Sequence, residues 1–399
     1  MLSLIVSPFY ILGNIYVLFR FFHWLESCQE VFKRKRLKLT LAIAYSLLAA
    51  AIAIVTFLPA NSALRRIVQL IANYWLGVFL YTLLVVIVGH FISLLLRRVF
   101  KVLPIDYFMN RRRHILCGTV SLLLIFGISA YGMYHARDIK LKEYTITVEK
   151  DAGGLDHLKV LLISDLHLGY SIGLSQIENG VALINSQKPD LVCLTGDIYD
   201  NNFDAIREPD QIADALAGIK STYGVYACWG NHDVDEKMFV GFAIGGNFKK
   251  GHNPNMYKFL DRANIKLLED EVELIDDKFY VVGRVDATRP ETENNARKTP
   301  AELLDGLDHT KPIVVLFHEP GELQSLADAG CDLLLSGHTH NGQVFPHTLF
   351  IRLAWENPAG LLKKDDMYSI VTSGLGVWGP FMRVGSDAEV VAVDVQFQK

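Results

Sequence analysis

The sequence predicts a chain in two parts, a helical region built to cross a membrane followed by an α/β domain. The first 136 residues hold long uncharged apolar runs, which account for the apolar content of 51% and the mean hydropathy of +0.23. From Tyr144 onward, short β-rich apolar runs alternate with helical ones. This alternation is typical of a sheet covered by helices on its faces.

Four apolar runs predict the membrane-spanning helices. A hydrocarbon core of about 30 Å needs about 20 helical residues, so each of the last three runs is long enough, and the first suffices if its end near Arg20 snorkels. We therefore expect about four transmembrane helices over residues 1–136. The runs are Leu2–Phe19, Leu39–Ala60, Ile67–Leu96 and Ile115–Ala136.

The basic residues of the loops predict an orientation. The first loop carries Lys and Arg over 33–38 and the third over 97–113, whereas the second has only Arg65 and Arg66. If basic loops stay in the cytoplasm, the N-terminus and everything after residue 136 lie outside. We expect the polar residues within the spans, Asn14, Asn73 and His90, to form interhelical hydrogen bonds rather than line a substrate path or hold a haem.

The second part divides into a juxtamembrane linker over 137–148 and a domain over 149–399. Strands are expected over 158–163, 191–194, 224–228, near 265 and 272, and over 279–285, 313–317 and 333–335; helices are expected over 174–187, 210–219, 255–263, 301–307 and 321–329. The last sixty residues show no clear helix. Their strands, over 368–372 and 389–395, are expected to build a second, more antiparallel sheet packed on the first.

Residues of metal-ligand type follow five of these strands. Ligands of such sheets collect beyond the carboxyl ends of the strands, so we expect one sheet edge to gather all of them. Seven candidates are too many for one tetrahedral ion but suit two adjacent ions that share a carboxylate, for which Asp197 is the natural bridge. Such a pair favours in-line displacement at phosphorus. The candidates are Asp165, His167, Asp197, Asn231, His318, His338 and His340.

His232 is the candidate general acid. It follows Asn231 directly, so on a loop its side chain can point away from the ions toward a leaving-group oxygen. Asp200, one short turn after Asp197, is expected to orient this imidazole and raise its basicity.

Taken together, these motifs resemble those of the calcineurin-like metallophosphoesterases. The resemblance covers about Lys159 to Val395 and runs through Asp165-x-His167, Gly196-Asp197-x-x-Asp200, Gly230-Asn231-His232-Asp233, His318 and Gly337-His338-Thr339-His340. It implies a four-layer α/β/β/α sandwich in which a hydroxide bridging two metals attacks the phosphorus and His232 assists. The implied ligands of the first metal are Asp165, His167, Asp197 and His340, and those of the second are Asp197, Asn231, His318 and His338.

The tail over 374–383 is similar to that of membrane-associated bacterial members of this family, which implies that Arg383 contacts a substrate phosphate. The expected protein is thus a multi-pass enzyme of a bacterial cell membrane with an extracytoplasmic active site. Its substrate would be a phospholipid, a lipid-linked diphosphate or a cell-envelope phosphodiester, with Met238–His252 as a lid or a solvated loop. The donors suit manganese, iron and zinc alike.

Two other functions stay open, a nucleotide phosphodiesterase facing the cytoplasm and a sensor or transport protein that binds phosphate compounds without hydrolysing them. A net charge of −4 with no basic stripe in the second part argues against nucleic-acid binding. The five cysteines show no metal spacing, and three of them fall in predicted strands, so we expect these to be core residues.

Overall fold

The computed structural model describes residues 2–59, 62–104, 106–107, 110–236, 238–239, 242–243, 252–288 and 297–398. The chain forms two compact units. The helical unit comprises Met1–Tyr134 with Met238–Ile244 and Gly379–Met382, and the sandwich unit comprises His135–Lys237, Gly245–Trp378 and Arg383–Lys399.

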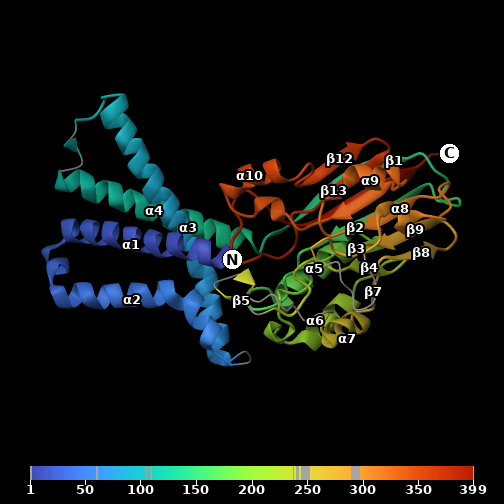
Figure 1. Cartoon of the computed structure of the whole chain (residues 1–399), viewed down its shortest axis with the longest axis horizontal. Helices are drawn as coiled ribbons and strands as arrows, with labels where there is room; N and C mark the ends of the chain where they lie inside the picture. Colours follow the sequence, from blue (N-terminus) through green and yellow to red (C-terminus); the bar gives the residue numbers. More distant parts are fainter. Residues whose placement is uncertain are drawn as a thin grey trace. The chain divides into compact units, whose positions relative to one another are not determined.

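Four long helices make up most of the helical unit: α1 (Leu2–Cys28), α2 (Lys35–Ile54), α3 (Ala63–Leu94) and α4 (Arg111–His135) (Figure 1). Short η1 (Glu30–Lys33), η2 (Val55–Phe57) and η3 (Leu95–Val99) turns flank them. Among the described residues, three helical stretches are long and apolar enough to cross a membrane: Lys35–Phe57, Ala63–Val99 and Arg111–His135. They coincide with three of the predicted spans. That α1 crosses as well stays a prediction.

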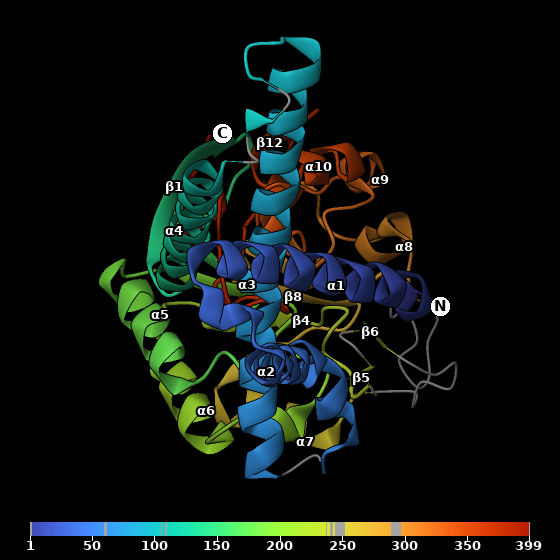
Figure 2. The same ribbon diagram turned by 90° about the vertical axis from the view of Figure 1, so that its left-hand side faces the viewer.

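Polar and aromatic side chains connect these helices. Tyr45 Oη on α2 donates a hydrogen bond of 3.0 Å to Asn14 Oδ1 on α1, the kind of interhelical bond predicted for Asn14. The ring of Trp75 on α3 lies edge-on to that of Tyr45, with centroids 5.3 Å apart. Asn73 Oδ1 accepts a bond of 2.8 Å from Gln69, one turn earlier in the same helix. Figure 2 shows α1 and α2 in blue, α3 in light blue to cyan and α4 in teal.

The sandwich unit contains two six-stranded sheets. The first has the order β1-β14-β2-β3-β4-β7, and its strands are β1 (Ile139–Val148), β14 (Ala388–Phe397), β2 (His157–Ile163), β3 (Leu191–Thr195), β4 (Val225–Cys228) and β7 (Ile265–Leu267). The second has the order β12-β13-β11-β10-β9-β8, and its strands are β12 (Gly360–Lys364), β13 (Met367–Val371), β11 (Leu333–Ser336), β10 (Ile313–Leu316), β9 (Phe279–Gly283) and β8 (Glu271–Ile275).

Apolar side chains hold the two sheets face to face. Val160 and Cys193 of the first sheet and Val281, Leu316 and Leu335 of the second belong to one buried cluster. This packing explains why the central strands are nearly continuous apolar runs, because strands covered on both faces need no polar alternation.

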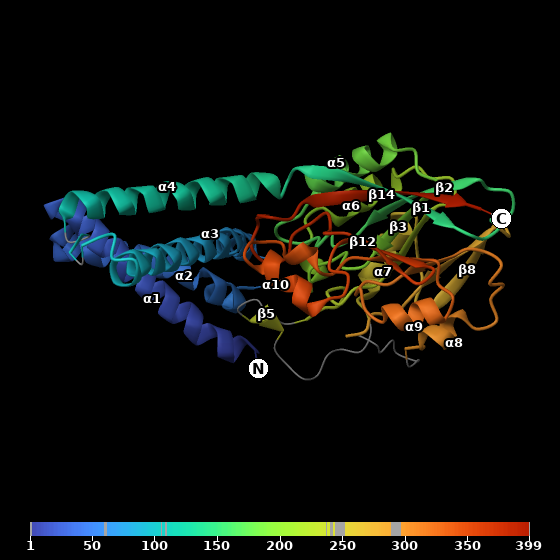
Figure 3. The same ribbon diagram turned by 90° about the horizontal axis from the view of Figure 1, so that it is seen from above.

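Helices cover the outer faces, so the predicted four-layer α/β/β/α sandwich is confirmed. A second buried cluster joins Val282 and Val315 of the second sheet to Leu303 and Leu326 on its helices. Figure 3 shows α5 and α6 on one side of the strands and α8 and α9 on the other. The helices are α5 (Leu174–Ser186), α6 (Pro209–Ala217) and α7 (Pro254–Arg262) beside the first sheet, and α8 (Pro300–Leu304) and α9 (Leu323–Asp328) beside the second.

The predicted linker over 137–148 is wrong for most of its length. Ile139–Val148 forms β1, which pairs in parallel with β14 along its whole length. Its exposed Lys140 and Lys142 suggest a solvated linker, but charged side chains are also common on an edge strand, where they discourage further pairing.

Two expectations for the last sixty residues are also wrong. They contain a helix, α10 (His347–Ala354), besides the short η6 turn (His340–Gly342). β14 joins the first sheet, pairing antiparallel with β2, and the second sheet is antiparallel only at its edges. The apolar run of α10 resembles a strand in sequence, and local propensity does not resolve so short an element.

The predicted lid over Met238–His252 falls mostly outside the described residues. Within it, β5 (Met238–Phe239) and β6 (Phe242–Ala243) pair as a two-stranded sheet. At its far end, the imidazole of His252 stacks on the ring of Trp229, with centroids 4.5 Å apart.

Candidate metal centre

All seven predicted ligands lie on turns that directly follow strands. Asp165 and His167 follow β2, Asp197 follows β3 and Asn231 follows β4, all in the first sheet; His318 follows β10, and His338 and His340 follow β11, in the second. The expectation of a single sheet edge is therefore wrong. The ligands meet because the two sheets face each other with these strand ends together.

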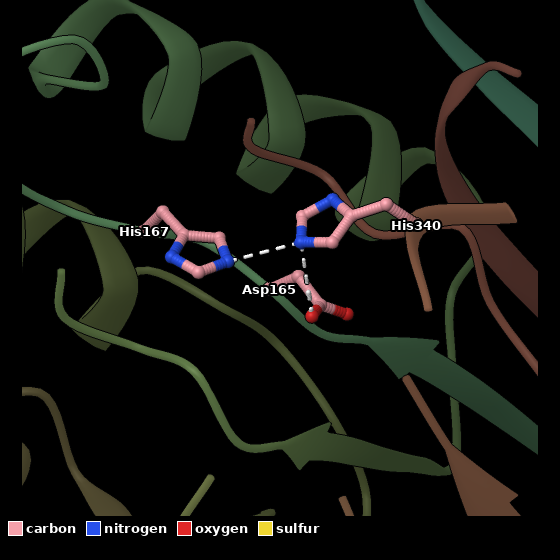
Figure 4. A group of neighbouring side chains, drawn as sticks. All are labelled: Asp165, His167 and His340. Atoms are coloured by element: carbon pink, nitrogen blue, oxygen red, sulfur yellow. Dashed lines mark hydrogen bonds and ion pairs between the residues drawn. The ribbon is translucent and has the colours of Figure 1, made fainter. Parts of the chain in front are cut away.

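One group of donors consists of Asp165, His167 and His340 (Figure 4). His167 Nε2 lies 3.0 Å from His340 Nε2, and His340 Nε2 lies 3.4 Å from Asp165 Oδ1. All three residues are buried. Their converging lone pairs have the arrangement of a first metal site.

A second group consists of Asp197, His318 and His338, with Asn231 between the two histidines. His318 Nε2 is 3.1 Å from both Asp197 Oδ2 and Asn231 Oδ1, and His338 Nδ1 is 2.9 Å from Asn231 Oδ1. Asp197 Oδ2 is also 3.6 Å from His167 Nε2 in the first group. Asp197 thus lies between the two groups, the position that a shared carboxylate requires.

The turns are strained in a way that local sequence does not favour. Five ligands adopt left-handed backbone conformations: Asp165 (φ 53°), His167 (φ 45°), Asp197 (φ 51°), His338 (φ 71°) and His340 (φ 49°). Such conformations cost about 1–3 kcal/mol each and persist only where the surrounding fold imposes them. The strands and their packing therefore supply the free energy that holds these donors in place.

Glycines let the turns approach one another. A Cβ on Gly337 would lie 2.0 Å from Ser164 Oγ and 2.3 Å from Asp165 Oδ2. A Cβ on Gly230 would lie 2.3 Å from Asp197 Oδ1. These contacts explain why a glycine precedes both His338 and Asn231, because any side chain there would push a ligand aside.

Hydrogen bonds fix the orientation of the second group. His318 Nδ1 donates to the Thr195 carbonyl at 2.7 Å, which leaves Nε2 facing Asp197. The backbone N–H of His338 donates to Asp165 Oδ1 at 3.0 Å, so a turn from the second sheet also positions a carboxylate of the first. Partners of this kind set the tautomer and the direction of metal-binding side chains.

The charges of the site are strongly coupled. Burial would raise the pKa of Asp197, but the charges of His318 and His232 hold it well below its usual range. Burial opposes protonation of His318, yet the neighbouring Asp197 raises its pKa well above the usual value. Burial lowers the pKa of His338 to about 3 and that of His340 well below normal. His338 and His340 are thus favoured in the neutral form that ligates metals. Burial would also lower the pKa of His167, but the carboxylates of Asp200, Asp197 and Asp165 outweigh burial and raise it.

These residues fit two divalent cations. Within each group, the donor atoms of the three residues lie within 4.8 Å of one another. Lone-pair donors crowd against one another in both groups, with His167 Nε2 at 3.0 Å from His340 Nε2 and His318 Nε2 at 3.1 Å from Asp197 Oδ2, an arrangement that a cation would relieve. A mixed set of carboxylate, amide and imidazole donors suits manganese, iron and zinc alike.

His232 lies beside the first group, as a general acid should. Its ring centroid is 5.0 Å from that of His167, and its backbone N–H donates to Asp197 Oδ1 at 2.8 Å. The ring nitrogen Nδ1 is hydrogen-bonded to Asn201 Oδ1, whereas the nearest oxygen of Asp200 is 3.6 Å away. The closest partner of the ring is therefore Asn201, which sequence reasoning missed although it directly follows the predicted Asp200.

Asp233 and Asp200 differ in their surroundings. Asp233 is fully buried and accepts hydrogen bonds from the backbone N–H groups of Ile198, Tyr199 and Gly230 at 2.7, 2.9 and 2.7 Å. It ties the turn after β3 to the turn after β4. Asp200 stays partly exposed and also lies 3.8 Å from His167 Nδ1.

The predicted substrate contact of Arg383 does not fit its setting. The side chain is 0% exposed, and Nη2 donates to the carbonyls of Ser373, Gly374 and Gly376 at 2.7, 3.0 and 2.6 Å. Nη2 also lies 3.3 Å from His340 Nδ1. The guanidinium holds the turn after β13 beneath the metal centre and is not accessible to a substrate phosphate.

Comparison with known proteins agrees with this geometry. A family model described as calcineurin-like phosphoesterase matches residues 158–342. An uncharacterized metallophosphoesterase of Helicobacter pylori (strain ATCC 700392 / 26695) is 30% identical over 71% of this chain and 72% of its own length, and one of Aquifex aeolicus is 29% identical over 67% and 96%. A transmembrane protein with metallophosphoesterase domain from Danio rerio is 30% identical over 69% of this chain, but the match spans only 62% of that relative.

Proposed function

The chain belongs to the calcineurin-like phosphoesterases, metal-dependent hydrolases of phosphoesters, and from this premise we propose that it is a membrane-anchored enzyme with two metal ions. The observation that carries the proposal is the position of Asp197 between two groups of donors, with His232 adjacent. A protein that only bound phosphate compounds would need neither the shared carboxylate nor the imidazole beside it.

In the proposed centre, Asp165, His167, Asp197 and His340 would hold the first ion, and Asp197, Asn231, His318 and His338 would hold the second. When bound, two such ions supply a water-derived nucleophile at neutral pH and neutralise the charge of the phosphoryl oxygens.

The chain's own side chains provide the remaining steps. For this role His232 must be protonated on both ring nitrogens: Nδ1–H keeps donating to Asn201 Oδ1, and Nε2 gives its proton to the leaving-group oxygen and leaves a neutral imidazole. The backbone N–H of His232 donates to Asp197 Oδ1. This bond holds the proposed acid, His232, at a constant separation from the proposed ligand, Asp197. The ring of Trp378, 5.8 Å from that of His232, shields this side of the site.

The membrane helices favour a substrate at the bilayer surface. Only residues 136–138 separate the end of α4 from the start of β1. A phospholipid, a lipid-linked diphosphate or a cell-envelope phosphodiester would lie within reach of a site so tethered. The basic residues of the first and third loops favour an orientation with this unit outside the cytoplasm, and the similarity of the tail over 374–383 to membrane-associated bacterial members favours a multi-pass bacterial membrane protein.

Hydrolysis of bis(p-nitrophenyl) phosphate by the purified full-length protein with manganese tests the proposal. Asp197→Asn should lower turnover to background and reduce the bound metal measured by mass spectrometry. Asp156→Asn, an exposed carboxylate of the same unit, is the matched control and should behave as wild type. Equal turnover by wild type and Asp197→Asn would refute the proposal, and bound metal without any turnover would favour the binding protein instead.

A lipid-extract screen then addresses the substrate. Extracts incubated with wild type should lose a phosphorylated component that persists with His232→Ala. If the extracts were unchanged while wild type hydrolysed soluble nucleotides in a parallel assay, the substrate would be a nucleotide and the lipid assignment would be wrong.

A further inference from the structure

Helix α10 exposes several large apolar side chains. Leu349 and Phe350 are each 59% exposed and Leu353 is 84% exposed; Phe345, just before the helix, is 42% exposed. Single exposed apolar residues are ordinary on protein surfaces, but a contiguous set of this size marks an interaction site.

The exposed residues share one face of the helix. At 100° per residue, Leu349, Phe350 and Leu353 fall within one arc of about 100°, and Ile351 falls on the opposite side. Ile351 is 8% exposed and anchors the helix. The helix lies beyond the ends of the strands of the second sheet rather than over a sheet face (Figures 1 and 3). Its inner face is thus fixed, and the described residues leave its outer face uncovered.

The exposed face is attached to the metal centre. His347 Nδ1 at the start of α10 is 3.0 Å from the carbonyl of Gly342, on the turn that carries His340. Gln343 bonds the backbone of Trp378 twice, accepting from its N–H and donating to its carbonyl, both at 2.9 Å. Trp378 in turn faces His232. Whatever α10 binds is therefore held beside the site.

A bilayer is the binding partner that the rest of the chain suggests for this face. The chain carries three helices suited to crossing a membrane, and the three residues after α4 span at most about 10 Å. The segment over 341–355 contains no Asp or Glu, and Arg352 is exposed at the side of the apolar arc. An apolar face flanked by a basic residue suits the headgroup region of an anionic membrane.

We propose that α10 is a membrane-docking helix whose Leu349, Phe350 and Leu353 insert into the interface of the bilayer that holds the chain's own helices. Docking sets the orientation of the sandwich unit and brings the side of the metal centre lined by Trp378 to the lipid headgroups. This inference goes beyond the proposed hydrolysis and does not depend on it, because insertion requires no turnover.

Site-directed fluorescence of the full-length protein tests the proposal. Exposed Cys117 and partly exposed Cys28 are replaced by serine, which leaves only buried cysteines. Leu353→Cys is then labelled with an environment-sensitive nitrobenzoxadiazole dye and reconstituted into vesicles of phosphatidylethanolamine and phosphatidylglycerol. The expected result is a blue-shifted emission that is quenched by nitroxide on the lipid acyl chains. Asp277→Cys, at a side chain that is 82% exposed on the turn between β8 and β9, is the control and should show neither effect.

A water-like emission at Leu353→Cys, or the same quenching at both positions, would overturn the proposal. A blue shift in lipid-free detergent that grows with protein concentration would assign the face to a second copy of the chain and overturn it too. As a second variant, Leu349→Glu combined with Leu353→Glu should retain hydrolysis of soluble bis(p-nitrophenyl) phosphate while nitroxide quenching of dye placed at Phe350→Cys is lost. Retained quenching in that variant would also contradict insertion.

Discussion

The two sheets of the sandwich contribute different chemistry to one centre. The first sheet carries every candidate oxygen donor, Asp165, Asp197 and Asn231, together with His167 and the proposed acid His232. The second supplies only imidazoles, His318, His338 and His340. The first sheet thus provides the carboxylates of the site, and the second provides most of its imidazoles. Neither sheet alone presents a complete ligand set.

This division makes the closure of the sandwich part of the function. The apolar core between the sheets brings the two halves together, and the turn with Gly337 is where they meet most tightly. Residues at that seam should matter more than residues within either half.

Among substitutions outside the proposed ligands, the largest effect is expected for Gly337→Ala. The new Cβ would meet Ser164 Oγ and Asp165 Oδ2 at 2.0 and 2.3 Å, so the turn of the second sheet must move away from the first. Displacement of this size costs about 10²-fold in kcat/KM or more. The assay is hydrolysis of bis(p-nitrophenyl) phosphate at saturating manganese.

Gly321→Ala is the matched control for that substitution. It also follows a ligand-bearing strand of the second sheet, but its Cβ would meet only Trp355 at 3.9 Å. Its activity should stay close to wild type. If both variants were equally active, the close contact between the two sheets at Gly337 would not matter for activity.

The next largest effect is expected when the proposed acid His232 loses its hydrogen-bond partner. The loss of activity should depend on the leaving group of the substrate. Asn201→Ala removes the partner of His232 Nδ1 and should lower kcat by about 10-fold, within the range found for partners that orient reactive groups. The loss should be larger for alkyl phosphoesters than for p-nitrophenyl esters, because a good leaving group needs little protonation.

Asp200→Ala provides the contrast. Its carboxylate is 3.6 Å from His232 Nδ1 but also 3.8 Å from His167 Nδ1. It should therefore reduce both classes of ester alike. The same leaving-group dependence in Asp200→Ala as in Asn201→Ala would restore the orienting role that the sequence predicts for Asp200.

The sequence predicts the candidate ligands but not how they come together. Asp165, His167 and the other candidates belong to motifs of a few consecutive residues, each on a turn after an apolar strand. Such motifs can be recognised from the local sequence alone. Which sheet a strand joins depends on pairing between distant segments, as for β14 beside β1 and β2. No local pattern specifies that choice.

Arg383 and α10 show the same limit in side-chain terms. An arginine near a phosphate-binding motif suggests substrate contact, and only the surrounding carbonyls of Ser373, Gly374 and Gly376 reveal a buried positioning group. The segment of α10 is short and apolar, so its helical state and its exposed face become visible only in the fold.

Arg383→Ala should therefore affect stability before binding. It leaves the carbonyls that Nη2 satisfies without a donor in a fully buried place, at a cost of about 3 kcal/mol. Without the arginine, the turn after β13 becomes less rigid. Because Gly374 on this turn packs against Asp165, the contact between the two sheets then weakens. We expect a lower unfolding temperature and a lower kcat with KM little changed. Arg207→Ala is the control, because the side chain of Arg207 is 70% exposed. A raised KM with unchanged stability in Arg383→Ala would instead support substrate binding by Arg383.

The smallest expected effect is on stability alone, and it concerns Asp387 and its partners beside β1 and β14 in the first sheet. Asp387 Oδ2 lies 3.0 Å from Lys142 Nζ, and its Oδ1 lies 2.9 Å from His135 Nε2. Burial alone would raise the pKa of Asp387, but the bonds and charges of Lys142 and His135 prevail and lower it. A lowered pKa in the folded state means that the stabilisation exists above the unfolded value of about 3.9 and disappears as the pH falls through the folded value.

Asp387→Asn should then lower the unfolding temperature at neutral pH by an amount corresponding to less than about 1 kcal/mol, since the pair is partly exposed. The difference from wild type should vanish once the pH is below the folded pKa of Asp387, and turnover at neutral pH should not change. Unfolding scans of both proteins across acidic and neutral pH measure this. A difference that persisted in acid, or a loss of turnover, would mean that the outer strands act on the metal centre, and the contrast between seam and periphery would fail.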